Sequence, residues 1–482
     1  MPNTEFFSTL LMALLGTLAL TSADRLVTQA NNTTVASAQA QTSIAFTHVT
    51  VIDGTGAAPK AGMVVLITGG RISAVGKVGE IKVPEGAQVV DATGKFLIPG
   101  LWDMHVHSVA YEEAKKAFPQ VVASGITGIR DMGAPKDEVL RLRAEIAEGK
   151  LLGPRMVVAG PILQGPLPSN LAKLPLLQSV SSEKEAKQAV VSLKQSGVDF
   201  IKVQDSLPRE LYFAIAAEAA RQRIPFAGHL PPAISAWEAS TAGQRSIEHL
   251  GGTHYGILIA CADSESELHA EVRGIMKSEI EAAFQGREPD NSMLFRAAFT
   301  RRLLESYSDR KAAALFRAFT KNNTWQVPTL AALRSLWNRK DLSEADIQYG
   351  TKVREKELEV VNVMRKSSVK VMAGTDGPLS EAAGNLHEEL ALLVEAGFTP
   401  MEALQSATRN PAEFLGLSSS IGSIQAGRLA DLVLLDANPL EDIRHTKKIR
   451  AVVLGGRYLD RDVLDRMLGQ AATAAAKSEK ES

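Results

Sequence analysis

The sequence has little of several features that would define a class of protein at once. Among its 482 residues there is one cysteine, Cys261, which excludes an internal disulfide and any zinc site built from several cysteines. Neither sign of charge is in excess, because 53 Lys and Arg residues face 54 Asp and Glu residues and the net charge is -1. Without a positive field, nucleic acid and anionic membrane surfaces are poor candidate partners. Any metal must be held by histidine, carboxylate or a less common ligand.

Long hydrophobic runs are also scarce. Residues 10–20, LLMALLGTLAL, are too few to cross a bilayer but match the core of an export signal, so we expect no stable membrane span. Residues 1–40 are therefore predicted to be an export signal and a flexible linker, and the protein to be periplasmic or secreted. The preceding segment contains Glu5 and no Lys or Arg, which is unusual for a signal. The alternative is a buried or frayed N-terminal helix.

The rest of the composition is that of a globular protein. Hydrophobic residues make up 45% and charged residues 22%, which excludes global disorder. Residues 41–98 contain short β-branched runs separated by turn formers, and similar runs return within residues 416–465. We expect these two segments to form one small β-sandwich domain. A polar tail is predicted over residues 466–482.

From residue 96 to about residue 415, apolar runs alternate with helix-like segments, and residues 99–415 are predicted to form one domain. The runs are FLIPGLW, GITGIRD, RMVVAG, DFIKVQ, IPFAGHL, RSIEHL, WQVPTL and KVMAGTD. Eight parallel strands with intervening helices make an α/β fold, the (β/α)8 barrel of TIM type. Residues 251–323 are longer and more helix-prone than one connection needs, so a helical insertion is predicted near the barrel mouth. Catalytic groups of such barrels lie at the carboxyl ends of the strands.

Histidines and an aspartate stand where several predicted strands end. His105 and His107 are two residues apart in one strand, so both imidazoles project from the same face. His229 ends IPFAGH, His249 ends RSIEH and Asp376 ends KVMAGTD. One histidine at a strand end is more often a core or surface residue, but the whole set at one barrel end predicts a metal centre. Imidazole and carboxylate ligands suit zinc or a similar divalent ion.

Lys202 lies inside the apolar run DFIKVQD. Burying an unpaired ammonium costs on the order of several kcal/mol, so a lysine that faces inward needs a partner or a chemical change. The alternatives are that Lys202 faces outward or pairs with Asp205.

Other polar residues near the strand ends are weaker candidates. Asp103 lies on the same strand face as His105 and His107. It is expected to hydrogen-bond to a metal-binding side chain rather than to bind the metal itself. Arg130 could hold a substrate carboxylate and Asp131 could buttress the site, with a structural ion pair as the alternative. The remaining candidate substrate contacts are Gln204, His254 and Tyr255.

The order of these motifs resembles the metal-dependent amidohydrolases, in particular their imidazolonepropionase-like and prolidase-like branch. The resemblance rests on PGLWDMHVH, a lysine in the fourth strand, GH, EH and GTD, in that order. GITGIRDMG, LHEELALLVEAGFTPMEALQSATRNPAEFLGL and GSIQAGRLADLVLLDANP are also similar to parts of that branch. The similarity covers nearly the whole chain after the predicted export segment.

The resemblance implies a binuclear centre of two divalent ions, with zinc as the expected metal. Carboxylated Lys202 would bridge the ions. The implied ligands are His105, His107 and Asp376 for the more buried ion, and His229 and His249 for the second. A hydroxide shared by the ions would be the nucleophile, and Asp376 would accept its proton and pass it to the leaving amine.

The resemblance leads to one leading hypothesis for the function, and two other functions remain as alternatives. The leading hypothesis is a hydrolase that cleaves a C–N amide bond in a dipeptide or N-acyl amino acid, as a prolidase-like peptidase does. The rival enzyme is a mononuclear cyclic amidohydrolase or deaminase, in which Lys202 is an ordinary lysine. A non-catalytic metal-binding scaffold is the third. The expected partner is a small-molecule substrate, and a homo-oligomer is compatible with the resemblance.

Overall fold

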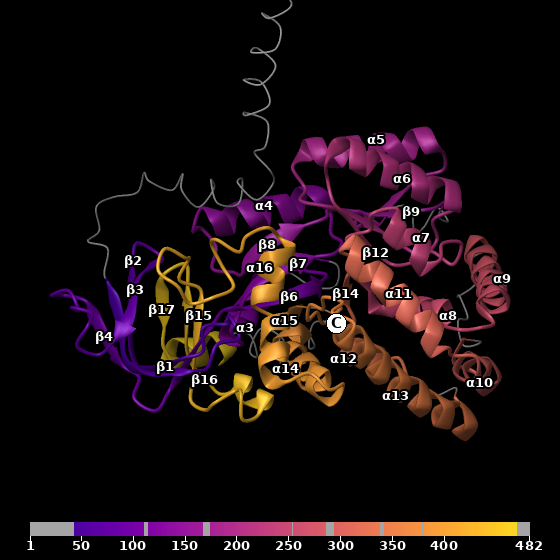
Figure 1. Cartoon of the computed structure of the whole chain (residues 1–482). Helices are drawn as coiled ribbons and strands as arrows, with labels where there is room; N and C mark the ends of the chain where they lie inside the picture. Colours follow the sequence, from indigo (N-terminus) through magenta and orange to yellow (C-terminus); the bar gives the residue numbers. More distant parts are fainter. Residues whose placement is uncertain are drawn as a thin grey trace, which may run out of the picture.

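The computed structural model describes residues 43–109, 114–166, 174–252, 254–285, 294–337, 342–377 and 379–469. The predicted export segment, and the predicted tail from residue 470 on, lie outside the described residues. Figure 1 shows strands from the two ends of the chain, coloured indigo and yellow, lying together on one side of the molecule. The helix-rich middle of the chain occupies the other side. Within the described residues, no helix combines the length and apolar character needed to cross a membrane.

Strands from both ends of the chain form one eight-stranded sheet. Its strands are β1 (Ile44–Val51), β2 (Lys60–Thr68), β3 (Arg71–Lys77), β4 (Gln88–Asp91), β5 (Phe96–Pro99), β15 (Leu432–Leu435), β16 (Ile449–Leu454) and β17 (Arg457–Leu459). The order is β17-β16-β15-β5-β1-β2-β3, with β4 beside β1. β5 joins the two halves because it pairs antiparallel with β15, Ile98 opposite Val433. The two-layer sandwich stays a prediction.

Parallel strands alternate with helices through the middle of the chain. One sheet contains β6 (Leu101–Val106), β7 (Ile126–Asp131) and β8 (Arg155–Val158). A second contains β9 (Ile162–Gln164), β10 (Leu177–Ser179), β11 (Ile201–Val203), β12 (Phe226–Gly228), β13 (Ser246–Glu248) and β14 (Trp325–Val327). Residues 370–376 lie between these sheets, because Met372 N donates to Gln326 O and Met104 N donates to Ala373 O. The segment therefore lies between β14 and β6 and is hydrogen-bonded to both strands.

The first predicted barrel strand, FLIPGLW, is divided between two sheets. β5 belongs to the eight-stranded sheet, whereas β6 begins the parallel strands, with Gly100 between them. A Cβ at Gly100 would lie 2.1 Å from Thr127 Oγ1, so no side chain fits where the chain crosses over. Sequence hydrophobicity is continuous across this point and did not reveal the change of sheet.

The helices follow the strands and cover the middle region. They are α3 (Ala114–Ala123), α4 (Lys136–Ala147), α5 (Glu183–Ser196), α6 (Arg209–Gln222), α7 (Ala236–Thr241), α8 (Gly256–Ala260), α9 (Glu265–Phe284), α10 (Ala297–Glu305), α11 (Asp309–Asn322), α12 (Leu330–Ser335), α13 (Glu344–Lys366), α14 (Leu379–Glu395), α15 (Pro400–Ser406) and α16 (Arg409–Phe414), with 3-10 helices η2 (His249–Gly251) and η4 (Ile443–Lys447). Capping boxes start α7, α13 and α15. The range predicted as a helical insertion contains α8 to α11, drawn at one side of Figure 1.

Candidate metal centre

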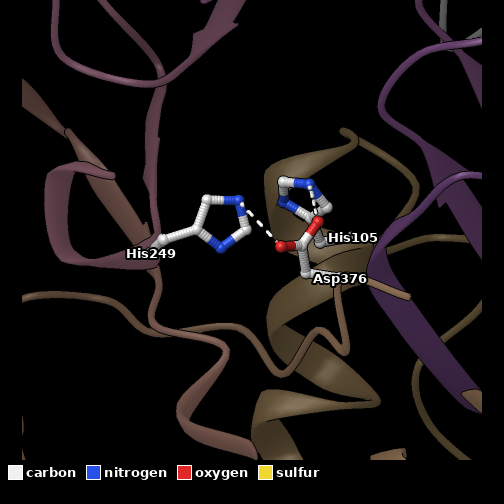
Figure 2. A group of neighbouring side chains, drawn as sticks. All are labelled: His105, His249 and Asp376. Carbon is white, nitrogen blue, oxygen red and sulfur yellow. Dashed lines mark ion pairs between the residues drawn. The ribbon is translucent and has the colours of Figure 1, made fainter. Parts of the chain in front are cut away.

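Three of the predicted ligands converge at one point, as Figure 2 shows. His105 Nε2 lies 3.2 Å from Asp376 Oδ1, and His249 Nε2 lies 3.6 Å from Asp376 Oδ2. One ligand atom from each of the three residues lies within 4.8 Å of the others. His105 lies on β6, His249 directly follows β13, and Asp376 ends the segment between β14 and β6. The carboxyl ends of strands that are distant in sequence therefore meet here.

The other two predicted histidines surround this group. His107 Nε2 lies 3.5 Å from Asp376 Oδ1. The ring centroids of His229 and His249 are 4.8 Å apart, and those of His105 and His107 are 5.4 Å apart. The structure therefore brings all four histidines and Asp376 together.

A hydrogen-bond partner on Nδ1 orients each of the four imidazoles. The pairs are His105 with Glu248 Oε2 at 2.9 Å, His107 with Gly133 O at 3.1 Å, His229 with Asp205 Oδ1 at 2.9 Å, and His249 with Thr329 Oγ1 at 2.6 Å. Carbonyl and carboxylate oxygens only accept, so in the first three pairs Nδ1 donates. A neutral ring that donates from Nδ1 keeps the lone pair on Nε2. This arrangement is typical of histidines that bind metal.

Burial and neighbouring charge set the ionisation of the centre. Burial opposes the charge on Asp376, but His249 and His105 outweigh it and hold the pKa of that carboxyl well below its usual range. Burial is the main reason that the pKa values of His229 and His249 are lowered, so both rings are neutral at pH 7. Burial also raises the pKa of Asp103 to about 7. An ionised carboxylate among neutral imidazoles is the state that divalent ions require.

Lys202 is buried beside the centre. The residue is 1% exposed, and its Nζ has no hydrogen-bond partner among the described residues. Burial lowers the pKa of Lys202 to about 8, although the negative charges of Glu248 and Asp376 act to raise it. Asp205 hydrogen-bonds to His229 instead. Both alternatives considered for Lys202, an outward orientation and a pair with Asp205, are therefore wrong.

Arg130 and Glu248 form a buried ion pair beneath the histidines. Arg130 Nη2 donates to both Glu248 oxygens, at 3.0 and 2.8 Å, and Nη1 donates to Ser246 Oγ at 2.9 Å. Arg130 and Glu248 are 0% exposed. The structure thus corrects the predicted substrate contact of Arg130, because its donors are already engaged in a structural ion pair. The partner in this pair is Glu248, and the neighbouring Asp131 accepts from Ser108.

The sequence analysis did not identify Glu248 as part of the site. Its carboxylate accepts from Arg130 and Ser246 and lies against His105, so it links a buried cation to a predicted ligand. Ser246 and Glu248 are two residues apart in a fully buried strand. Two polar residues on one face of a buried strand are a signal that could have found this network.

The remaining candidate substrate contacts are partly or fully buried. His254 Nε2 lies 2.7 Å from Leu230 O, and Nδ1 lies 3.9 Å from Asp205 Oδ1. Gln204 Oε1 and the Tyr255 hydroxyl have no hydrogen-bond partner among the described residues. Tyr255 stacks on Phe299, with 6.1 Å between ring centroids. Substrate contacts by Gln204, His254 and Tyr255 stay predictions.

Unusual backbone conformations gather around the centre. Nine non-glycine residues of the described ranges have positive φ, and five of them belong to the site or its adjoining loops. They are His249, Leu250, Tyr255, Thr329 and Asp376, with φ between 48° and 61°. Each such residue costs roughly 1–3 kcal/mol, and such residues cluster at functional sites.

Comparison with known proteins decides the family. The model of the amidohydrolase family matches residues 96–459, well over half of the chain. The chain belongs to the amidohydrolase family. The resemblance inferred from the order of the motifs is therefore confirmed.

Three relatives show the range of this similarity. Adenine deaminase 1 of Desulfotalea psychrophila is 25% identical over 400 residues, which cover 81% of this chain but 53% of the deaminase, so the chain spans about half of that relative. Imidazolonepropionase of Rubrobacter xylanophilus is 25% identical over 393 residues, 77% of this chain and 84% of that protein. The crystal structure of a candidate prolidase from Bifidobacterium longum is 25% identical, with a TM-score of 0.64 over 89% of this chain and 99% of that one. The likeness to this solved structure, together with the family match, implies a TIM barrel for the α/β region.

Proposed function

We propose that this protein is a metal-dependent hydrolase that cleaves a C–N amide bond of a small molecule, a dipeptide or an N-acyl amino acid. The observation that carries the proposal is the convergence of His105, His249 and Asp376, with partners on Nδ1 that turn each Nε2 toward the carboxylate. Family membership and the relatives named imidazolonepropionase and prolidase support the same reaction class.

The residues of the centre fit a bound cation. His105 donates from Nδ1 to Glu248, so its Nε2 lone pair points at an Asp376 oxygen 3.2 Å away. A ring that keeps its lone pair on Nε2 and an ionised carboxylate are both acceptors, and a cation between them would remove their repulsion. His105 Nε2 has no hydrogen-bond partner among the described residues, which supports the same interpretation. His105, His107 and Asp376 would hold this ion, and His249 lies between it and the proposed second site.

A second ion is proposed from the residues on the other side of the centre. His229 lies beside His249, and Lys202 places a buried amine nearby without a partner among the described residues. Carboxylation joins the neutral amine to carbon dioxide, forms an N–C bond and releases one proton, so a neutral group becomes an anion. An anion at Lys202 would add a second negative charge to that of Asp376 and so offset more of the charge of two divalent ions. Zinc is the proposed metal because the ligands are mainly imidazoles.

The side chains of this chain supply positioning and proton transfer. When bound, divalent ions polarise a carbonyl group and lower the pKa of water to about 7. Asp376 is ionised and lies at the carboxyl end of the strands, so its carboxylate can accept a proton from the attacking water. The same carboxyl then returns that proton to the leaving nitrogen. Glu248 and Thr329 keep His105 and His249 oriented throughout.

A mononuclear cyclic amidohydrolase or deaminase is the second candidate. It is favoured by the similarity to adenine deaminase 1 and by the three-residue group of His105, His249 and Asp376. In that case Lys202 remains an amine and one ion suffices. The third candidate, a non-catalytic metal-binding scaffold, would be excluded if the protein turned over any substrate.

A substrate panel tests the proposal. The full chain, loaded with zinc in the presence of bicarbonate, is incubated with dipeptides, N-acyl amino acids, cyclic amides and aminopurines, and released amine or ammonia is measured. We expect amide hydrolysis that Asp376→Asn reduces about 10²- to 10⁴-fold and that Asp137→Asn, at an exposed aspartate, leaves unchanged. Ammonia release from an aminopurine alone would favour the deaminase. No turnover on any member would favour the scaffold.

A periplasmic or secreted location is a separate proposal, since it rests on residues 10–20 alone. Determination of the N-terminal residue of protein recovered from the periplasm or medium tests it. Recovery only from the cytoplasm with residue 1 intact would contradict export.

A further inference from the structure

A cavity of about 330 Å³ lies away from the metal centre. The eight-stranded sheet contributes Arg71 and Arg457, and the parallel-strand region contributes Trp102, Arg143, Leu152 and Arg155. Its size lies at the lower end of the range of small-molecule sites, which is about 300–1,000 Å³. The cavity therefore has room for a compact ligand between the two parts of the molecule.

The charged groups that line this cavity are all of one sign. Among the residues that the structure describes, four arginines line it, and no aspartate or glutamate does. Arg143 is held by Asp199 at 2.7 Å and Arg155 by Asp431 at 2.6 Å, so both guanidinium groups are fixed in place. Arg457 is exposed and forms no ion pair within the part of the chain that the structure describes. Guanidinium groups bind carboxylate and other oxyanions through directed hydrogen bonds.

Apolar side chains form the rest of the lining. They include Trp102, Ile146, Leu152, Met156 and Leu454. The Trp102 ring is fixed in position because it packs on Gly128, where a Cβ would lie 2.1 Å from the indole. A rigid aromatic surface next to guanidinium groups suits a ligand with an apolar body and an anionic group. We propose that this cavity binds a small organic anion of that kind, an aryl or alkyl carboxylate or sulfonate.

The cavity is distinct from the metal centre. Trp102 lies near the start of β6, whereas His107 follows its end, and five residues of strand span about 16 Å. Arg155 begins β8. Catalytic groups of TIM barrels lie at the carboxyl ends of the strands, and this cavity lies at the amino ends. The proposal therefore does not depend on the reaction that the metal centre performs.

Titration of the full chain with 8-anilinonaphthalene-1-sulfonate, followed by its fluorescence, tests the proposal. Arg457→Gln removes one guanidinium group, and we expect it to weaken binding about five- to tenfold. Ala147→Trp places a large side chain at an exposed position of the cavity lining, so it should weaken binding at least as much. Arg301→Gln changes an exposed arginine of α10 outside the cavity and should leave binding unchanged. Circular dichroism confirms that each variant is folded.

Two competitors identify the chemistry of the ligand. The neutral analogue N-phenyl-1-naphthylamine should bind more weakly than the sulfonate and should not distinguish Arg457→Gln from the parent. Inorganic phosphate at equal concentration should fail to displace the sulfonate, because it lacks an apolar body. Equal sulfonate affinity in the parent and both cavity variants would overturn the site. Equal affinity of the neutral analogue would overturn its anion preference, and displacement by phosphate would overturn its preference for an apolar body.

Discussion

Removal of the negative charge of Glu248 should destabilise the protein far more than removal of a surface carboxylate. Glu248→Gln keeps the shape of the side chain and its ability to accept a hydrogen bond, but it leaves the guanidinium group of Arg130 buried without a counter-charge. Both partners are at most 1% exposed. Breaking a buried ion pair by changing one partner costs about 3–5 kcal/mol. We expect a loss of that size in the free energy of unfolding.

The matched control is Glu183→Gln. Glu183 forms an ion pair with Lys187 on the surface of α5, where both side chains are about half exposed. Exposed pairs contribute about 0–1 kcal/mol because water and salt screen them. Urea-induced unfolding, followed by tryptophan fluorescence at pH 7, compares the two variants with the parent.

A double variant separates the ion pair from other effects of the substitution. Arg130→Met together with Glu248→Gln removes the uncompensated charge, so its loss of stability should be smaller than the sum of the two single losses. The metal affinity of Glu248→Gln should also fall about 10- to 100-fold, since His105 loses the carboxylate that orients it. A loss below 1 kcal/mol in Glu248→Gln, or strictly additive losses in the double variant, would refute the reasoning.

Four further predictions concern single residues. Lys202→Ala should lower the metal content per chain, because the proposed bridge is lost; normal metal content by elemental analysis would exclude the bridge. Asp376→Asn should reduce turnover about 10²- to 10⁴-fold with little change in the melting temperature, and a fully active variant would remove Asp376 from the mechanism. Burial raises the pKa of Glu357 to about 8, so the folded chain holds a proton that the unfolded chain has lost above about pH 5. Stability should therefore fall from pH 5 to pH 8 by up to about 1.4 kcal/mol per pH unit, and Glu357→Gln should flatten this dependence in urea unfolding. Burial also raises the pKa of the Cys261 thiol to about 12, so Ellman's reagent should react with it only after unfolding, and rapid reaction in the native state would contradict its burial.

The ligands of the proposed centre could be predicted from sequence because two simple regularities place them. Side chains two residues apart share a face of a strand, which unites His105 and His107. The carboxyl ends of successive parallel strands lie at one end of a barrel, which brings His229, His249 and Asp376 to the same place. Both regularities depend only on local spacing and on the order of strands.

The supporting network could not be predicted in the same way. A structural ion pair was one prediction for Arg130, but its partner Glu248 is 118 residues away and could not be named. Side-chain pairing inside a barrel depends on which strands face each other and on register, and neither is encoded in local hydrophobicity. The division of FLIPGLW at Gly100 was hidden for a similar reason, since both halves of the run are buried in different sheets.

Metal content per chain tests the central claim most directly. The full chain is expressed with added zinc and bicarbonate, freed of loosely bound ions, and measured by elemental analysis. The proposed centre predicts about two ions per chain, held by histidines, Asp376 and carboxylated Lys202. About one ion per chain would contradict the bridging lysine, and none would contradict a metal centre at His105, His249 and Asp376.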